Sequence, residues 1–235
     1  MMQKIKTIIR FPMDIWLMFV TYLPGRSGYK LRYRYWKKRL EYLGKNVRIE
    51  IGVHFQNPEY IEINDDSWID RNVIIMAGPD NSKREKIVRK NDNYPGKPGH
   101  VYIGKNCHIT NNSIISGVSA GIYMGNDGGI AAGGKIYSFS NHYRSKKEPS
   151  NEKFSLSAAS SHDKQCMLEG PIFIGNNSPM AMNVVVLPGV TIPDNCFVAI
   201  GSVLTGGEFP ENSIIAGNPA KAIRPRFIRD ESEKD

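Results

Sequence analysis

The chain has 235 residues, of which 40% are hydrophobic, 10% aromatic and 23% charged, an ordinary composition for a globular protein with one sizeable core and a small appendage. Its net charge of +8 lies at the N-terminus: the first 48 residues hold twelve lysines and arginines against Asp14 and Glu41, or +10, so the remainder carries −2. We therefore expect no nucleic-acid partner. A basic segment beside apolar residues fits an anionic membrane surface or a phosphorylated substrate equally well.

The cysteines and the apolar N-terminal stretch exclude several classes of protein. Cys107, Cys166 and Cys196 lie far apart without CxxC spacing, which argues against a disulfide scaffold or a structural zinc and favours a reducing cytoplasm. The apolar stretch 11–23 is interrupted by a proline and an aspartate, and no small-residue cleavage site follows it. It is also shorter than the roughly 20 apolar residues that span a bilayer. We expect neither a cleaved signal peptide nor a transmembrane helix.

Residues 1–46 are predicted to form a basic amphipathic helical segment. Apolar side chains recur at three- and four-residue steps until Pro24 and Gly25 end the run: Ile8, Phe11, Ile15, Met18, Phe19 and Tyr22. The following segment, 29–43, is dense in cationic and aromatic residues and stops at Gly44. Two interpretations stay open. The helices pack on the main body with their cations in water, or residues 1–40 form an interfacial anchor on anionic lipid.

From about residue 47 the sequence shows a six-residue repeat. It is clearest after residue 173, where every sixth residue is aliphatic: Ile174, Met180, Val186, Ile192, Val198 and Leu204. Four residues after each of the first five stands a small or β-branched residue: Ser178, Val184, Val190, Cys196 and Ser202. The same spacing returns upstream, at Ile63, Ile69 and Ile75, at Ile103, Ile109 and Ile115, and at Met124, Ile130 and Ile136.

A parallel β-helix explains this double pattern, which neither a helical period nor simple alternation does. Three hexapeptides make one triangular coil; the first residue of each repeat points inward, and the residue four later fits a corner that admits only small side chains. Cys107 and Cys196 fall at this small position and are interpreted as packing residues. Cys166 lies outside the register, and we do not expect it to be a catalytic thiol.

The predicted β-helix covers residues 47–226 and is followed by a charged tail, 227–235. Two polar segments without the repeat, about 79–99 and 143–170, are predicted insertions. Insertions in a solenoid leave one edge of the coil and often overhang the binding face.

Among the five histidines, His142 is the best candidate for a catalytic base. Continuing the register of Met124, Ile130 and Ile136 would place an inward aliphatic residue at 142, where the chain leaves the coil for its longer insertion. An imidazole on that rim can take a proton from a hydroxyl group. The alternative, a histidine that merely ends the strand, stays open on these residues alone.

A three-histidine zinc site of the carbonic anhydrase kind, which hexapeptide coils also carry, is a rival. Such a site needs three imidazoles that converge across a subunit boundary, two of them a few residues apart. No histidine follows His142 closely, and His108 stands at an outward position of the repeat. We therefore expect no metal.

Longer motifs carry a family resemblance over roughly residues 20–226. IGNNSPMAMNVVVLPGVTIPDNCFVAIGSVLT and FPENSIIAGNPAKAIRPR resemble the C-terminal half of the hexapeptide-repeat acyltransferases, chiefly the polysaccharide, galactoside/maltose and serine O-acetyltransferases. The run GGKIYSFSNH resembles the stretch with that family's catalytic histidine. YLPGRSGYKLRYRYWKKRLEYLGKNVRI resembles the lead-in of sugar O-acetyltransferases of capsule, exopolysaccharide and lipopolysaccharide pathways.

The resemblance implies an all-β, left-handed β-helix that forms a homotrimer and uses acetyl-CoA as co-substrate in a groove between two coils. His142 would deprotonate a sugar hydroxyl that attacks the thioester directly, a backbone N–H would hold the oxyanion, and Asn141 would orient the imidazole. The implied CoA contacts are Ala181, Met182, Ile200, Gly201, Thr205, Lys221 and Arg224. The two cations suit nucleotide phosphates; alternatively they are solvated charges near the C-terminus.

Three departures from the family pattern touch the implied CoA groove. Residues 179–181 read PMA where the family usually has WIG, residues 200–202 read IGS instead of AGS, and two glycines, 206–207, replace a common lysine. The donor is therefore expected to bind differently, to bind weakly or to carry another acyl chain. His142 is untouched by these changes.

The sequence favours an enzyme that acetylates a hydroxyl of a surface polysaccharide or its lipid-linked precursor, in the cytoplasm or at the inner face of the membrane. A close alternative is acetylation of a small soluble acceptor, such as a free sugar, an amino sugar or an antibiotic. A non-catalytic trimeric β-helix, acting as a scaffold or binding module, is the alternative from another class.

Overall fold

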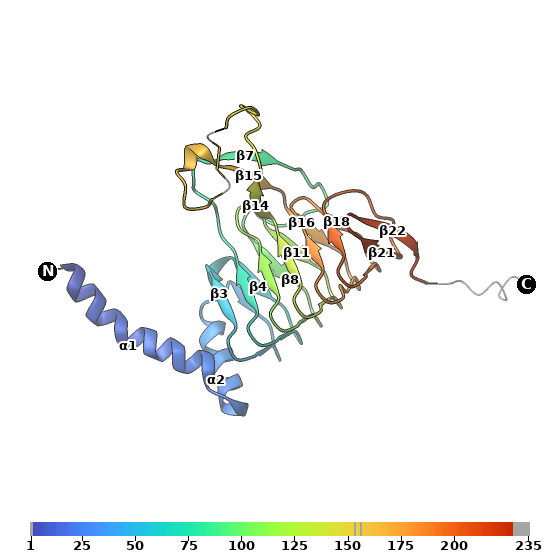
Figure 1. The fold of residues 1–235 in the computed structure, drawn as a ribbon. Helices are drawn as coiled ribbons and strands as arrows, with labels where there is room; N and C mark the ends of the chain where they lie inside the picture. Colours follow the sequence, from blue (N-terminus) through green and yellow to red (C-terminus); the bar gives the residue numbers. More distant parts are fainter. Residues whose placement is uncertain (1, 153, 156, 228–235) are drawn as a thin grey trace, which may run out of the picture.

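The computed structural model describes residues 2–152, 154–155 and 157–227, and only the backbone of residues 2–11. Short strands wind through three parallel sheets around one apolar core, so the predicted left-handed parallel β-helix is confirmed (Figure 1). Two helices precede it, α1 (Met2–Tyr22) and α2 (Gly25–Lys37), and two 3-10 turns interrupt it, η1 (Pro58–Tyr60) and η2 (His162–Lys164). Of the predicted tail 227–235, only Phe227 lies within the described residues.

The three sheets form the sides of a triangular prism. The first side holds β1 (Tyr42–Leu43), β4 (Ile61–Ile63), β8 (Val101–Ile103), β11 (Ile122–Met124), β16 (Ile172–Ile174) and β18 (Thr191–Ile192). The second holds β2 (Arg48–Ile49), β5 (Trp68–Ile69), β9 (His108–Ile109), β12 (Gly129–Ile130), β19 (Phe197–Val198), β21 (Ser213–Gly217) and β22 (Ala220–Pro225). The third holds β3 (His54–Gln56), β6 (Ile74–Met76), β10 (Ile114–Ser116), β13 (Lys135–Tyr137), β17 (Val185–Val186) and β20 (Val203–Leu204).

The inward aliphatic residues predicted from the repeat stack on one another from coil to coil. On the third side, Ile115 pairs with both Ile75 and Ile136, and all three are at most 1% exposed. Cys107 and Cys196 are also buried, which confirms their packing role. Burial raises the pKa of the Cys107 thiol to about 11, so this group stays protonated at neutral pH.

The corners between the sides depend on asparagine and aspartate in the left-handed backbone conformation. Asn72, Asn112 and Asn183 all have φ near +58° to +59° at corners that lead into the third side. These residues tolerate the conformation because their short side chains bond nearby polar groups. The Asn177 amide, for example, donates to Asn195 of the next coil at 2.9 Å. Each corner thus turns the chain and joins it to its neighbour.

The N-terminal boundary differs from the prediction. Helix α2 ends at Lys37 rather than near residue 43, because Tyr42 and Leu43 already form β1 and pair with β4. Leu43 is 1% exposed and belongs to the core, so the first coil begins ahead of the predicted residue 47. No helix among the described residues combines the length and apolar character needed to cross a membrane.

A buried arginine fixes the angle between α1 and α2. Arg32 is 1% exposed; its Nε donates to the carbonyl of Ile49 at 2.8 Å, and its Nη1 donates to the carbonyl of Leu23 at 2.7 Å. A cation there satisfies carbonyls that the end of α1 leaves unpaired. Gly28 allows the close approach, because a Cβ at this position would collide with the Leu23 carbonyl. Helix α1 is therefore anchored at its C-terminal end.

The two predicted insertions join into one structure, which we call the flap. It contains β7 (Glu85–Val88) from the first insertion and β15 (Cys166–Glu169) from the second, with β14 (Phe139–His142) at the edge. Strand β15 lies between the other two, antiparallel to β14 and parallel to β7. The flap rises from one corner of the coil (Figure 1).

Replacing Ile136 with alanine tests the inward stack. Ile136→Ala should lower the free energy of unfolding by about 2–5 kcal/mol, because it leaves a cavity between Ile115 and Val186 that a close-packed coil cannot close. Lys135→Ala in the same strand is the control, since Lys135 is exposed, and should change stability by less than about 0.5 kcal/mol. Urea denaturation followed by circular dichroism measures both. Equal effects of the two substitutions would contradict the assigned register.

Candidate active site

His142 lies on the flap, at the end of β14, and not in the coil itself. The coil closes below it, because the Gly170 amide donates to the Ser138 carbonyl at 3.0 Å. The chain therefore leaves the repeat at Ser138, a few residues earlier than the hexapeptide register suggested. His142 is half-buried and lies beyond this corner, at the end of β14, rather than at the next inward position of the register.

The imidazole of His142 is held through one ring nitrogen. Its Nδ1 lies 2.7 Å from the carbonyl oxygen of Arg144. A carbonyl oxygen only accepts, so this bond assigns the ring proton to Nδ1 and leaves the lone pair on Nε2. The Arg144 amide lies 3.4 Å from the same nitrogen, a longer and weaker contact than the 2.7 Å bond to the carbonyl. The ring of Tyr143 packs at 4.5 Å between centroids. The held tautomer is the one that a general base needs.

A carboxylate from the other insertion fixes the turn that follows His142. Glu85 in β7 accepts hydrogen bonds from Ser145 Oγ at 2.7 Å and from the amides of Lys146 and Lys147 at 2.8 and 3.0 Å. Burial raises the pKa of Glu85, but these hydrogen bonds outweigh it, and the pKa is lowered from its usual value. Glu85 therefore positions the turn that supplies the Arg144 carbonyl. The sequence carried no signal for this residue.

Cys166 stands between the two groups in the sheet, opposite His142 in β14 and Glu85 in β7. Its side chain is buried, and burial together with the charge of Glu85 raises the pKa of the thiol. A protonated thiol is a poor nucleophile. The geometry thus favours a packing role for Cys166.

Asn141 precedes His142 in β14, so the two side chains point to opposite faces of that strand. Asn141 pairs with Met167, whereas His142 pairs with Cys166. The contact that orients the imidazole in the structure comes from the Arg144 carbonyl. An orienting role for Asn141 stays a prediction.

A network of ion pairs fastens the flap to the coil. Lys86 Nζ lies 3.0 Å from Glu169 and 3.3 Å from Asp80, and Ser119 of the coil donates to Glu169 at 2.6 Å. Burial raises the pKa of Asp80, but hydrogen bonds from Ser82 and Arg84 and the charge of Arg84 outweigh it and lower the pKa to about 2. These bonds hold β7 and β15 in place. They therefore also hold the part of the flap that supports His142.

The first insertion continues along the coil edge beyond β7. Arg89 Nη1 donates to the carbonyls of Pro188 at 3.1 Å and Thr205 at 2.6 Å. Asn91 donates to the Pro171 carbonyl at 3.0 Å. The predicted CoA contact Thr205 thus lies on the same coil corner from which the flap departs.

Four other predicted CoA contacts gather at a different corner. Ala181 and Met182 lie in one coil and Ile200 and Gly201 in the next, joined by a 2.9 Å hydrogen bond from the Gly201 amide to the Met182 carbonyl. Met182 is 49% exposed and Ile200 62% exposed, so they form an apolar surface. This corner precedes the strands of the third side, whereas the flap follows them. One chain therefore does not bring these four residues to His142.

The two predicted cationic contacts lie at the C-terminal end of the coil. Lys221 and Arg224 are exposed on β22, which pairs antiparallel with β21. Arg224 lines a hollow of about 570 Å³ between these strands and Phe227. Both side chains are exposed and can meet a phosphate. Lys221 pairs with Ala216 of β21, and Gly217 beside it donates to Ser202, close to the corner of Met182 and Ile200.

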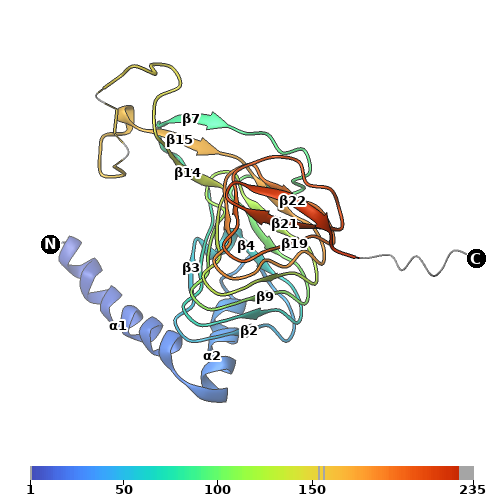
Figure 2. The ribbon, with the colours of Figure 1, turned by 45° about the vertical axis from the view of Figure 1, so that its right-hand side comes forward.

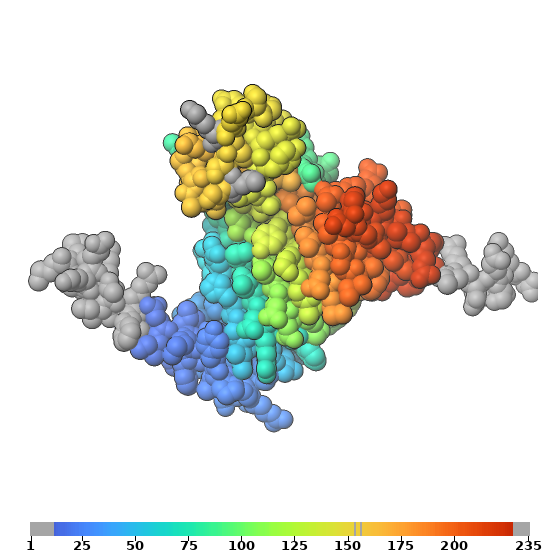
Figure 3. All heavy atoms as spheres, viewed as in Figure 1, coloured from blue at the N-terminus to red at the C-terminus, as the bar shows by residue number. Residues whose placement is uncertain are grey.

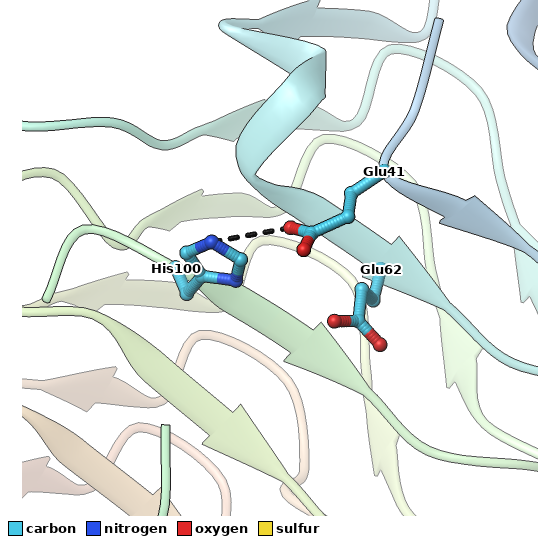
Figure 4. Close-up of side chains that lie close together, drawn as sticks. All are labelled: Glu41, Glu62 and His100. Atoms are coloured by element: carbon cyan, nitrogen blue, oxygen red, sulfur yellow. Dashed lines mark ion pairs between the residues drawn. The ribbon is translucent and has the colours of Figure 1, made fainter. Parts of the chain in front are cut away.

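One group among the described residues could hold a cation. Glu41, Glu62 and His100 offer ligand atoms within 4.8 Å of one another, and His100 Nε2 lies 3.1 Å from Glu41 (Figure 4). These residues come from three successive coils, and Glu41 is exposed. Without a metal the histidine and the carboxylate pair directly. His142 is not part of this group, so the cluster adds nothing to the candidate base.

No protein-family model matches the chain. A Staphylococcus aureus (strain COL) protein named as an acetyltransferase is 46% identical over 55 residues, 23% of this chain and 27% of that protein. The galactoside O-acetyltransferase of Escherichia coli (strain K12) is 44% identical over 64 residues, 27% of this chain and 31% of that enzyme. The chain thus matches less than a third of the length of these relatives.

Solved structures extend the likeness to the whole fold. An N-acyltransferase from Bacillus cereus, AntD, in complex with dTDP and 3-hydroxybutyryl-CoA has a TM-score of 0.63 at 17% identity, over 83% of this chain and 87% of that one. A maltose O-acetyltransferase from Clostridium difficile 630 has a TM-score of 0.53 at 18% identity, over 89% and 82%. Such identity shows the fold alone. Together with the acetyltransferase names of the sequence relatives, it confirms the predicted resemblance to hexapeptide-repeat acyltransferases.

Replacing Asp80 tests the anchor of the flap through its pH dependence. The pKa of Asp80 falls from 3.8 to about 2 on folding, so its contribution is present above the unfolded value and is lost as pH falls through the folded value. Asp80→Asn should therefore destabilise the protein by about 2 kcal/mol at neutral pH, and the difference from wild type should vanish near pH 2. Urea denaturation at several pH values measures this difference. A difference that stays constant with pH would contradict the role of the charge.

Proposed function

We propose that this protein is an acetyl-CoA-dependent O-acetyltransferase that acts on a sugar hydroxyl of a surface polysaccharide or its lipid-linked precursor. The observation that carries the proposal is the 2.7 Å contact between His142 Nδ1 and the Arg144 carbonyl oxygen. Nδ1–H donates to the Arg144 carbonyl, and Nε2 is left as a proton acceptor. The likeness to named acetyltransferases supplies the reaction class.

In the proposed reaction His142 Nε2 takes the proton of the acceptor hydroxyl as the oxygen attacks the thioester carbonyl carbon. The new C–O bond gives a tetrahedral oxyanion, which a backbone N–H stabilises. The C–S bond then breaks, the acetyl ester is released, and the CoA sulfur recovers the proton from His142. Once Nε2 has taken the proton, the ring is positively charged, and its Nδ1–H donates to the Arg144 carbonyl. Glu85 holds the turn that follows this carbonyl.

We propose that the complete site forms between two copies of a homotrimer. The apolar surface of Met182 and Ile200 precedes the strands of the third side, and the flap with His142 follows them. In a trimer, the Met182 and Ile200 surface of one copy can lie against the flap of the neighbouring copy. Met182 and Ile200 would then lie along the apolar pantetheine arm, and Lys221 and Arg224 are the candidate phosphate partners.

A cationic hollow on the flap supports an anionic acceptor. A space of about 700 Å³ between the two insertions is lined by Lys83, Arg84, Lys86, Lys146 and Lys147, against three acidic residues. A sugar carried on a phosphate or diphosphate matches this charge. We place the reaction in the cytoplasm or at the inner face of the membrane; three buried, unpaired cysteines are compatible with a reducing compartment.

A second candidate is transfer of an acyl group to the amine of an activated amino sugar. The observation that favours it is the AntD fold likeness, since that N-acyltransferase was solved with dTDP and an acyl-CoA. A hydroxyl must lose its proton to a base as it attacks. A neutral amine can attack through its lone pair and lose its proton afterwards. Dependence on His142 over a range of pH therefore distinguishes the two acceptors. A scaffold without catalysis would transfer nothing to either.

Removing the proposed base is the primary test of the function. His142→Ala should lower kcat for acetyl transfer roughly 10²–10⁴-fold, because a positioned general base contributes about this factor. The matched control is His108→Ala, since His108 is exposed, pairs with Asp70 at 3.0 Å and packs against the Trp68 ring, away from the flap. Release of CoA, followed with a thiol reagent, measures both variants on sugar acceptors. Retention of full activity in His142→Ala would refute the proposed base.

Glu85 is expected to act as a positioning residue. Glu85→Gln removes the charge that holds the turn of Ser145 and Lys146, so kcat should fall about tenfold while KM for acetyl-CoA stays unchanged. The steady-state parameters separate this from a general loss of structure, and circular dichroism checks the fold. An unchanged kcat, or an equal change in KM, would contradict positioning through the turn.

A further inference from the structure

Helix α1 carries an apolar stripe that the rest of the chain leaves uncovered. Ile15, Met18, Phe19 and Tyr22 share one face of the helix and are 47%, 59%, 47% and 59% exposed. Trp16, 48% exposed, stacks on Phe19 with ring centroids 5.8 Å apart. The predicted members Ile8 and Phe11 lie outside the residues whose side chains are described.

The opposite flank of α1 faces the protein, so the stripe points away from it. Val20 is fully buried and Leu17 is half-buried against the core. Arg32 holds the end of the helix by its carbonyls. Helix α1 projects from the first coil as a separate arm (Figure 1), and its coloured residues lie at the N-terminal end of the coil (Figure 3). Of the two interpretations left open by the sequence, packing on the chain's own coil does not hold for the described stripe.

A cationic hollow lies next to this arm. Arg26, Lys30 and Arg34 recur every fourth residue along α2 and face Lys45 and Arg48 of the first coil. The hollow measures about 850 Å³, and no acidic residue lines it; its remaining lining residues are Tyr29, Tyr33, Asn46 and Val47. Arg48 stacks over Tyr29 with its guanidinium carbon 4.6 Å from the ring centre. Arg48 already pairs with Glu50 at 2.7 Å, so the charge left for an anion comes from Arg26, Lys30, Arg34 and Lys45.

We propose that the stripe and the hollow together form a docking surface for an anionic lipid bilayer. The stripe would lie in the boundary between headgroups and acyl chains, as the apolar face of an interfacial helix does. The hollow would take the phosphate of one anionic lipid, and each nearby cation would add attraction to the negatively charged leaflet. The proposal goes beyond the transfer reaction and does not depend on it.

Charge favours a lipid surface over a second copy of the chain as the occupant. The occupant must offer apolar material to the stripe and negative charge to the hollow within a short distance. The chain beyond residue 48 has a net charge of only −2, so another copy offers little to the four lining cations that remain besides Arg48, which pairs with Glu50. A bilayer of anionic lipids presents both kinds of surface at once.

The arm and the flap extend to the same side of the coil in two views (Figures 1 and 2).

Sedimentation of the full chain with vesicles tests the proposal. We expect binding to vesicles of equal parts phosphatidylcholine and phosphatidylglycerol, at least tenfold weaker binding to phosphatidylcholine alone, and release by added salt. The double variant Arg26→Glu with Lys30→Glu should lose at least tenfold in affinity for the anionic vesicles. Met18→Ser with Phe19→Ser should do the same, because both side chains are exposed and their loss leaves the core intact.

Matched changes elsewhere on the surface are the controls. Lys105→Glu with Lys135→Glu alters charge equally on exposed parts of the coil, and Val88→Ser removes an apolar side chain that is 62% exposed on the flap. Both should bind vesicles like the wild type. Vesicle binding needs neither acetyl-CoA nor an acceptor, so its failure leaves the transfer reaction standing.

Three results would overturn the docking surface. The wild type fails to bind anionic vesicles, or the charge-reversed variant binds them equally well. In the third, Met18→Ser with Phe19→Ser changes the oligomeric state in size-exclusion chromatography without changing vesicle binding. This last result would assign the stripe to another copy of the chain.

Discussion

The structure depends on one constraint, the ladder of hydrogen bonds that keeps successive coils in register while the chain makes long excursions. The bond from the Gly170 amide to the Ser138 carbonyl is an example. It closes the corner across the second insertion, so that β13 before the insertion and β17 after it are neighbours in the third side. With the corner closed beneath it, the flap has a rigid base. His142, Arg144 and Glu85 can then keep a fixed arrangement on segments that have no repeat of their own.

The repetitive part of the fold could be read from the sequence because each coil repeats the same packing problem. Ile136 and Ile192 are buried for the same reason, and Cys196 is small for the same reason as Ser178. The start of the coil could not be predicted from the sequence in the same way. The single pair Tyr42–Leu43 carries no period, and its place is decided by pairing with β4, which is a contact distant in sequence.

The candidate site was predictable only in part. His142 stood out because it follows a run of inward aliphatic residues, but its role depends on partners that the sequence does not mark. Glu85 reaches it through the pairing of β7 with β15, two segments from different insertions. Arg144 contributes a backbone carbonyl, which any residue could supply. Likewise, the cations of α2 were visible in the sequence, but not the hollow that gathers them with Arg48.

The central claim is that His142 on the flap meets acyl-CoA bound against a neighbouring coil. A crystal structure with coenzyme A bound tests it most directly. We expect the CoA sulfur to lie within reach of His142 Nε2, at about 3–4 Å, with the pantetheine arm along Met182 and Ile200 of another copy. A sulfur bound at a corner of the coil that His142 cannot reach would contradict it.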